Sequence, residues 1–327
     1  MKAIVYREYG PPDVLRCEEI DKPTPGDSEV LLQIRAAALN PYDWHFMRGE
    51  PYAVRLMAGI GKPKNTRIGA DVAGIVESVG RNATQFKAGD AVYGVCQGAF
   101  AEYVCVAETK LVKKPDAVSF EQAAAIPIAG LTALQALRDK GKIQPGHAVL
   151  VNGASGGVGT CGVQIAKAFG AKVTGVTSTR NIELVRSIGA DDVIDYTKQD
   201  FTRSDKRFDL ILDCVGNHTF SECLRVLHPK RILVPAGGKT DNWMLEPIGR
   251  MIAAAVQSLF VSQKQISIFA KMNQSDLLAM NELLLSGKVK PIIDRTCTLA
   301  EVPEAMRYLE EGHARGKVVV VVDGHRA

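Results

Sequence analysis

Length, composition and charge exclude several classes of protein. The chain has 327 residues, of which 46% are hydrophobic, so it is long enough for two domains with cores of their own. Its net charge of +4 is slight for this length and gives no reason to expect nucleic acid or a membrane surface as a partner. Its seven scattered cysteines form no CxxC pair, which predicts free thiols in a reducing compartment: the cytoplasm, or an organelle stroma or matrix.

We expect neither a targeting segment nor a membrane span nor a metal site. The charged pair Arg7-Glu8 follows the start of the chain too soon for a secretory signal. The apolar run after Met251 is interrupted by Gln257 and Ser258, so it does not predict a membrane-spanning helix. The six histidines form no HxxxH pattern, which argues against a structural zinc.

The first part of the chain, up to about Phe120, has the pattern of a β-rich domain. Short β-capable runs alternate with turn signals such as Gly10-Pro11-Pro12 and Ala88-Gly89-Asp90. This spacing predicts a small barrel or a rolled antiparallel sheet. The predicted strands cover residues 2–6, 14–17, 30–37, 73–79 and 91–93.

After Phe120, helices and strands alternate, which predicts an α/β domain with a parallel sheet covered on both faces. Helices are expected over 121–139 and 219–227, and strands over 149–151, 172–177, 192–196, 208–213 and 231–235. The tail has two amphipathic helices over 275–286 and 302–311 and a buried strand over 316–322. We expect this tail to return to the first domain, so that residues 1–122 and 265–327 form one domain and residues 123–264 the other.

The stretch VLVNGASGGVG, residues 149–159, is where we expect a cofactor to bind. A short apolar strand runs into a glycine-dense turn, and a helix-like segment that stops at Gly170 follows at once. In this order, backbone N–H groups at the helix start face the ligand, and no side chain blocks the approach of a pyrophosphate. Small residues in such a turn can also serve packing alone, so the motif needs support from its neighbours.

The end of the next strand gives that support. It reads Thr177, Ser178, Thr179, Arg180, with no carboxylate to accept a hydrogen bond from a ribose 2′-hydroxyl. Hydroxyls followed by a guanidinium suit a 2′-phosphate, so we predict NADPH rather than NADH as the cofactor. The alternative is an ordinary polar loop with a solvated arginine.

Motifs along nearly the whole chain carry a family resemblance through their order. They are Ala38-Leu39-Asn40-Pro41-Tyr42-Asp43, Gly69-Ala-Asp-Val-Ala-Gly74, Val76-Glu-Ser-Val-Gly80, Gly89-Asp90-Ala-Val-Tyr-Gly94, Ala129-Gly-Leu-Thr-Ala133, the glycine turn, Ser187-Ile-Gly-Ala-Asp191, Asp213-Cys-Val-Gly216 and Gly316-Lys-Val-Val. The chain resembles a zinc-free medium-chain dehydrogenase/reductase, in the branch of NADPH-dependent quinone oxidoreductases and alkenal or enone reductases. This resemblance implies a GroES-like β-rich catalytic domain and a Rossmann domain, whose doubly wound parallel sheet binds the nucleotide.

The chain departs from the zinc alcohol dehydrogenases of the same superfamily at their metal sites. Those enzymes carry a cysteine near Pro41 and a His-Glu pair where this chain has Ala70-Asp71, and the four-cysteine lobe before Phe100 is missing here. A Lewis acid is what stabilises the alkoxide of a simple ketone. We therefore expect acceptors that spread the charge themselves, namely quinones and α,β-unsaturated carbonyls (enones or alkenals).

The resemblance places residues 40–48 in the cleft between the domains and implies two catalytic candidates. Tyr42 can donate a hydrogen bond or a proton to the substrate oxygen, or it only packs beside Pro41. Asn40 can orient the carbonyl or the nicotinamide, or it caps the next turn. We expect Asp71 to pair with Arg48 or another base rather than to act in catalysis.

The resemblance also implies the contacts to NADPH from the nicotinamide to the adenosine. Gly156, Gly157 and Val158 face the pyrophosphate, and Ser178, Arg180 and Tyr196 face the 2′-phosphate end. Thr132, Val215, Gly237, Gly238 and Phe260 approach the nicotinamide half. An enoyl-thioester reductase, or a weakly catalytic NADPH-binding protein with a regulatory or structural role, is the alternative function, and the superfamily implies a homodimer through the sheet edge near 256–268.

Overall fold

The computed structural model describes residues 1–237 and 261–322, which form two compact units. The first unit comprises Met1–Ile128, Met272–Leu285 and the chain from Pro291, and the second comprises Ala129–Lys271 and Ser286–Lys290. The first exchange between the units falls at Ile128 rather than at residue 122. The reason is that helix α3 (Phe120–Ala124) packs against strands β3 and β4 of the first unit.

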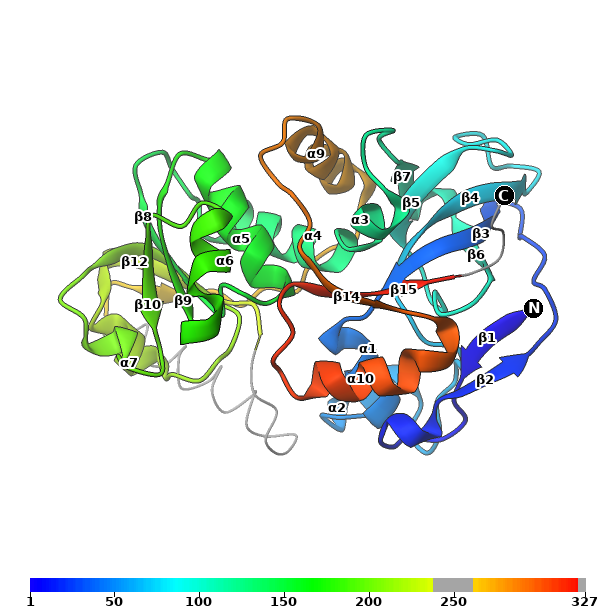
Figure 1. The fold of residues 1–327 in the computed structure, drawn as a ribbon, viewed down its shortest axis with the longest axis horizontal. Coiled ribbons are helices and arrows are strands. Elements are labelled where there is room, and N and C mark those ends of the chain that lie inside the picture. Colours follow the sequence, from blue (N-terminus) through cyan, green and yellow to red (C-terminus); the bar gives the residue numbers. More distant parts are fainter. Residues whose placement is uncertain (238–260, 323–327) are drawn as a thin grey trace. The chain divides into compact units, whose positions relative to one another are not determined.

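The first unit is built on a seven-stranded sheet in the order β14-β15-β3-β4-β5-β7, with β6 paired to β3 (Figure 1). Its strands are β3 (Glu29–Ala38), β4 (Asp71–Val79), β5 (Ala91–Val95), β6 (Tyr103–Ala107), β7 (Leu111–Lys113), β14 (Ile293–Cys297) and β15 (Lys317–Val321). The strands from the first part of the chain pair antiparallel, as predicted. The C-terminal β15 pairs antiparallel with β3 and parallel with β14, so that Val319 lies opposite Ala38.

A separate two-stranded sheet pairs β1 (Lys2–Val5) with β2 (Arg16–Glu19). The second strand begins later than predicted, and the reason is local. Pro12 opens a short 3-10 helix over Pro12–Val14, where its fixed φ and missing N–H suit the first position of a helix but not a strand. The predicted strand over 14–17 is therefore displaced towards the C-terminus.

The second unit contains six parallel strands in the order β10-β9-β8-β11-β12-β13, which confirms the predicted α/β fold class with a doubly wound parallel sheet. The strands are β8 (Ala148–Asn152), β9 (Lys172–Thr177), β10 (Asp192–Asp195), β11 (Phe208–Asp213), β12 (Leu227–Pro235) and β13 (Lys264–Gln265). The strand order reverses between β8 and β11. The carboxyl ends of these two strands mark the topological switch point, where ligands bind to sheets of this kind.

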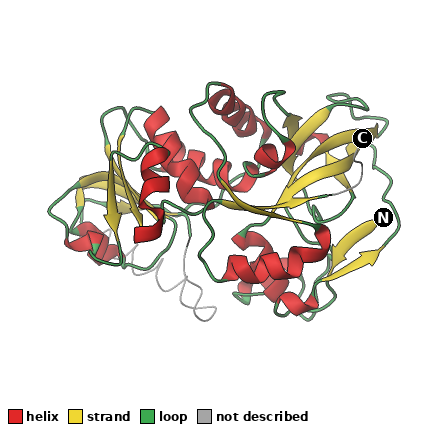
Figure 2. Cartoon of the chain, in the orientation of Figure 1, coloured by secondary structure: helices red, strands yellow, loops and turns green. Residues whose placement is uncertain are grey.

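Helices pack on the sheets of both units (Figures 1 and 2). Helix α5 packs on β8 and β9, and α6 packs on β9 and β10. The helices are α1 (Pro41–Arg48), α2 (Ala53–Ala58), α3, α4 (Pro127–Gln135), α5 (Gly157–Ala168), α6 (Ile182–Ser187), α7 (Phe220–Leu224), α9 (Gln274–Leu285) and α10 (Val302–Glu310).

The single helix predicted over 121–139 is wrong. The structure has α3, a break before Pro127, then α4, and a π-helix over Ala136–Lys140. Pro127 has no N–H and disfavours a helical conformation at the preceding residue, so it ends one helix and opens the next.

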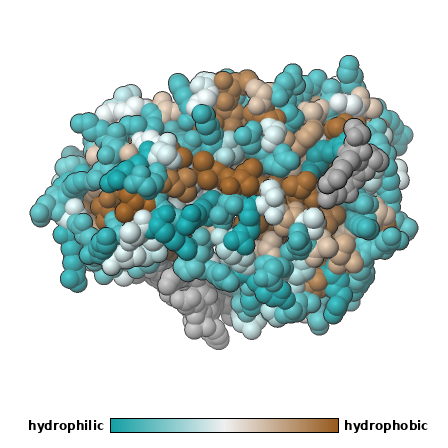
Figure 3. All heavy atoms as spheres, in the orientation of Figure 1, coloured by the Kyte–Doolittle hydropathy of each residue, from teal (hydrophilic) through white to brown (hydrophobic). Residues whose placement is uncertain are grey.

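The apolar residues lie mainly in the interior. The face drawn in Figure 3 carries mostly hydrophilic side chains, with apolar patches between them. Within residues 1–237 and 261–322, no helix combines the length and the apolar character that crossing a bilayer requires.

Candidate functional site

The glycine turn joins β8 to α5 at the switch point of the parallel sheet. Gly153, directly after β8, has a φ of +80°, which a side chain would strain. A Cβ on Gly159 would lie 2.0 Å from the carbonyl oxygen of Gly153, so turn and helix touch backbone to backbone. Helix α5 has Gly156 as its N-cap and no side-chain cap. Its first N–H groups are therefore bare of side chains, as an anionic ligand requires.

Polar side chains tie the glycine turn to the end of β9. Ser155 Oγ accepts hydrogen bonds from Thr177 Oγ1 at 2.9 Å and from Asn181 Nδ2 at 3.1 Å. In the chain, Ser178 lies between Thr177 and Asn181, directly after the carboxyl end of β9. Arg180 is exposed in the short 3-10 helix that follows. Ser178 and Arg180, two of the three residues predicted for the 2′-phosphate end, thus lie in the segment that these hydrogen bonds tie to the turn predicted for the pyrophosphate.

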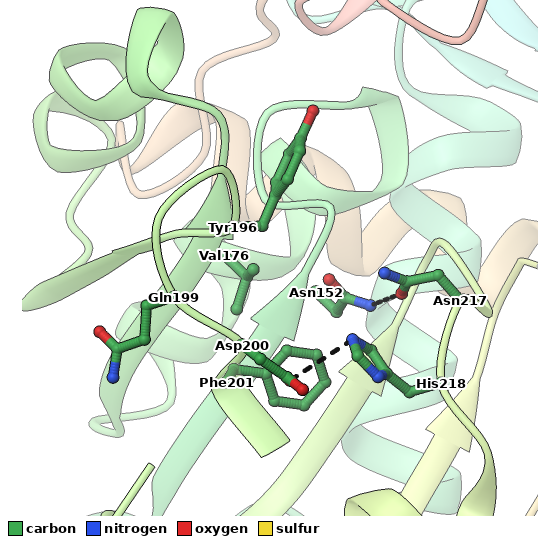
Figure 4. A pocket seen from close by; sticks show the side chains of 8 residues that line it. All are labelled: Asn152, Val176, Tyr196, Gln199, Asp200, Phe201, Asn217 and His218. Carbon is green, nitrogen blue, oxygen red and sulfur yellow. Dashed lines mark hydrogen bonds and ion pairs between the residues drawn. The ribbon is translucent and has the colours of Figure 1, made fainter. Parts of the chain in front are cut away.

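A pocket of about 260 Å³ opens at the carboxyl ends of β8 to β11 (Figure 4). Asn152 Nδ2 donates to Asn217 Oδ1 and to Asp213 Oδ1, each at 2.8 Å, which braces the loop after β11. His218 Nε2 lies 3.8 Å from Asp200 Oδ1. The lining residues are Asn152, Val176, Tyr196, Gln199, Asp200, Phe201, Asn217 and His218. Tyr196 is among the residues that the sequence predicted for the cofactor.

The remaining predicted cofactor residues follow strand ends or lie on α4. Val215 follows β11, where its N–H donates to Asp213 Oδ1 at 3.0 Å. Gly237 follows β12, and a Cβ there would lie 2.4 Å from the carbonyl oxygen of Cys214. Thr132 lies on α4. Gly238 and Phe260 lie outside the described residues.

The two predicted catalytic residues lie at the start of α1 in the first unit, in different surroundings. Tyr42 is half-exposed, and its ring lies 4.4 Å from that of Phe46. Burial, and then the charge of Asp43, raise the pKa of Tyr42. Asn40 is buried, and its Nδ2 donates to Ala38 O at 3.1 Å and to Asp71 Oδ2 at 2.9 Å. Both of its N–H donors are thus used inside the protein.

The partner of Asp71 is Lys317 rather than Arg48. Lys317 Nζ lies 3.1 Å from Asp71 Oδ2, while Arg48 pairs with Glu310, with 2.9 Å between Nη2 and Oε2. Of the two expected alternatives, Arg48 or another base, the structure thus shows the second. Lys317 was missed as a site residue, although a lysine that opens a strand of four valines is itself a signal, since lysine is rarely buried without a partner.

Among the described residues, no group of three or more histidine, cysteine or acidic side chains is arranged to hold a metal ion. Cys105, which lies close in sequence to the missing four-cysteine lobe, is half-buried. Burial is the main cause that raises the pKa of its thiol to about 11.

Two family models match the chain: a zinc-binding dehydrogenase family over residues 188–320 and an alcohol dehydrogenase GroES-like domain over residues 26–116. The chain is 35% identical to a chloroplast envelope quinone oxidoreductase homolog of Arabidopsis thaliana, with 98% of each chain covered. It is also 35% identical to a chloroplastic NADPH-dependent alkenal/one oxidoreductase of Arabidopsis thaliana, over 98% of this chain and 79% of the other.

Solved structures are similar over the same extent. The quinone oxidoreductase from Coxiella burnetii matches with a TM-score of 0.86 and 31% identity, covering 98% of this chain and 99% of that one. The Escherichia coli quinone oxidoreductase complexed with NADPH matches with a TM-score of 0.84 and 26% identity, covering 98% of this chain and 100% of that one.

Proposed function

Because the chain belongs to the medium-chain dehydrogenase/reductase superfamily, in the branch of quinone oxidoreductases and alkenal/one reductases, we propose that it reduces quinones or α,β-unsaturated carbonyls with NADPH. The observation that carries this proposal is the glycine-lined start of α5 at the switch point of the parallel sheet. This backbone geometry supports a dinucleotide site, because uncapped N–H groups at the start of a helix can face a pyrophosphate.

The residues present fit NADPH, which supplies a hydride when bound. Gly156, Gly157 and Val158 offer the first N–H groups of α5 to the pyrophosphate. Ser178 and Arg180 offer a hydroxyl and a guanidinium to the 2′-phosphate. The pocket of Figure 4, with Tyr196 at its edge, suits the adenosine. Thr132, Val215 and Gly237 are left for the nicotinamide half, as the resemblance implies.

We propose that this reduction needs no zinc. Asp71 stands where zinc enzymes of the superfamily have a ligand pair, and here the Lys317 ammonium, 3.1 Å from its carboxylate, already balances its charge. A second cation beside a lysine ammonium is repelled. Acceptors that delocalise the incoming charge, as quinones and conjugated carbonyls do, make a Lewis acid unnecessary.

On the substrate side we propose Tyr42 as the group that meets the substrate oxygen. Its hydroxyl is a donor on a half-exposed side chain, so both a substrate and water can reach it. Asn40 has no N–H left to offer a substrate, because its amide is engaged with Ala38 and Asp71. We therefore propose that Asn40 serves catalysis by holding the start of α1 rather than by touching the substrate.

We further propose that the protein is cytoplasmic or resides in an organelle stroma or matrix, because its described cysteines are free thiols, and that it is a homodimer. Strand β13 lies at the edge of the parallel sheet, and an edge strand can pair with that of a second copy. Of the predicted contact region 256–268, the first five residues lie outside the described chain. Sedimentation of the purified protein tests the dimer.

The function is tested by NADPH consumption, in parallel with NADH, in the presence of a chelator. The acceptors are a simple ketone, a benzoquinone, a short 2-alkenal, a cyclic enone and an enoyl thioester. We expect turnover of the quinone or the enone with NADPH, unchanged by the chelator. Loss of activity on chelation, or preference for the simple ketone, would contradict the metal-free proposal. Preference for the thioester, or NADPH binding without turnover, would favour the alternative functions.

A further inference from the structure

Three polar side chains meet in the interior of the first unit, where β3 ends and β4 and β15 begin. Asn40, Asp71 and Lys317 are each at most 5% exposed, and we call them the Asp71–Lys317 cluster. Lys317 Nζ donates to Asn40 Oδ1 and, at 3.1 Å, to Asp71 Oδ2, and Asn40 Nδ2 donates to the same carboxylate oxygen at 2.9 Å. Each member contacts both others, so none can move alone.

Asp71 also accepts a hydrogen bond from a backbone N–H at the start of α4. Its Oδ1 accepts a hydrogen bond from Ile128 N at 2.9 Å, which satisfies one of the free N–H groups in the first turn of the helix. A carboxylate at this end of a helix also opposes the helix dipole favourably. Asp71 therefore accepts three donors, an arrangement that favours its ionised form.

Asn40 holds the start of α1 in the same way. It is the N-cap residue, and its backbone N–H donates to Asp43 Oδ2 at 2.8 Å, while its side chain faces Lys317 and Asp71. Thus the two helices that begin in this region, α1 and α4, both have their first turns attached to one ion pair. In sequence, α1 carries Tyr42 and α4 carries Thr132.

The titratable groups in and beside the cluster include one ammonium, that of Lys317, and two carboxyls, those of Asp71 and Asp43. Asp43 is 1% exposed, and Asp71 adds its charge beside it. Burial raises the pKa of Asp71, and the Lys317 ammonium is the largest of the causes that lower it again. Burial, and then the charge of Asp71, raise the pKa of the Cys96 thiol, which stays neutral. Without Lys317, nothing in this group of side chains would balance an ionised Asp71.

We propose that Lys317 is a positioning residue for the reduction: through Asn40 and Asp71, its ammonium fixes the first turns of α1 and α4, the helices whose sequences carry Tyr42 and Thr132. This inference rests on the proposed function, since those two residues are the ones assigned to the substrate and to the nicotinamide. A displacement of about 1 Å at such groups is enough to lower a rate by roughly a hundredfold. Binding at the glycine turn and the 2′-phosphate end does not involve the cluster.

The test uses three variants of the full chain and one control. Lys317→Met removes the charge, Asp71→Asn with Lys317→Met removes both charges, and Asn40→Leu leaves the ion pair but detaches α1. The control, Lys113→Met, makes the same substitution in an exposed pair, where Lys113 Nζ lies 3.3 Å from Asp90 Oδ2. For each protein, kcat and KM for the acceptor that the wild type reduces, the Kd for NADPH and the melting temperature are measured.

We expect kcat to fall at least about tenfold in all three variants, with KM and the Kd for NADPH within about threefold of the wild type. The double variant, which leaves no unpaired charge at positions 71 and 317, is expected to melt close to the wild type and still to turn over slowly. The control is expected to match the wild type in every measurement. Recovery of stability without recovery of kcat is what distinguishes positioning from a merely structural ion pair.

Two results would overturn the inference. One is a double variant whose kcat lies within twofold of the wild type, and the other is an Asn40→Leu variant with unchanged kcat. The Asn40→Leu result decides the matter if the Lys317 variants do not fold. A wild type that reduces none of the acceptors would instead contradict the proposed function, so the two failures are told apart in the same assay.

Discussion

The end of the parallel sheet where we propose that the cofactor binds, called the cofactor end below, and the Asp71–Lys317 cluster are both polar regions, but they are built in opposite ways. At the cofactor end, glycines expose the backbone N–H groups at the start of α5, which no side chain caps. In the cluster, each polar side chain is buried and engaged with another. The first arrangement leaves donors open for a ligand, and the second leaves none. The comparison teaches that binding groups and positioning groups can be separated by whether their hydrogen bonds are already made.

The largest effect is expected from a substitution that adds one methyl group at the glycine turn. In Gly159→Ala the new Cβ would meet the carbonyl oxygen of Gly153 at 2.0 Å, and neither backbone segment can yield cheaply. We expect a loss of about 1–3 kcal/mol in the free energy of unfolding and loss of measurable NADPH binding, read by calorimetry. Gly61→Ala is the control, since nothing lies within 4 Å of a Cβ there. Wild-type affinity in Gly159→Ala would contradict this account of the turn.

Removing one exposed side chain that is predicted to bind the cofactor should have a smaller and more selective effect. Arg180→Ala is expected to cost about 1.5–3 kcal/mol of NADPH binding and to leave NADH binding nearly unchanged, because only NADPH carries the 2′-phosphate. Titration of both cofactors measures this difference. Arg186→Ala, at an exposed arginine on α6, is the matched control. Equal losses for both cofactors would mean that Arg180 does not meet the 2′-phosphate.

The buried region should show itself in the pH dependence of stability. Burial, followed by the charge of Asp71, raises the pKa of Asp43 to about 7, whereas an unfolded aspartate titrates near 3.9. Between these pH values the folded chain holds the extra proton, so this group makes stability fall as pH rises, by up to about 1.4 kcal/mol per pH unit. Above about pH 7 the effect levels off.

Asp43→Asn removes this titration, so the stability of the variant relative to the wild type should rise from about pH 4 to about pH 7 and then stay constant. Urea unfolding of both proteins across this range measures the difference. A constant difference would show that Asp43 has the same charge in the folded and unfolded chains.

The smallest effect is expected at Tyr42, whose character is intermediate between the two regions: its side chain is half-exposed, and its pKa is raised. Tyr42→Phe should lower kcat about tenfold, less than the loss of a sole general acid, because water can replace an exposed hydroxyl. Steady-state kinetics with the quinone or the enone measures it. An unchanged kcat would leave Tyr42 with packing against Phe46 as its only role.

Local patterns in the sequence were enough to predict the elements near the cofactor. The run from β8 through the glycine turn to α5 is continuous in the chain, so its chemistry can be read from adjacent residues. The parallel sheet followed from the alternation of helices and strands along this part of the chain. The single helix over 121–139 failed because one proline, Pro127, outweighed the helical preference of its neighbours.

What the sequence by itself determined is therefore the glycine turn, the two kinds of sheet and the hydroxyl and guanidinium groups after β9. The tertiary structure alone decided the Asp71–Lys317 cluster, whose lysine lies 246 residues from Asp71 and 277 from Asn40 in the chain. It also decided that Arg48 pairs with Glu310 and that Asn152 braces Asn217. The physical reason is that spacing encodes which face a residue takes on its own element, whereas the partner of a buried charge depends on which strands become neighbours.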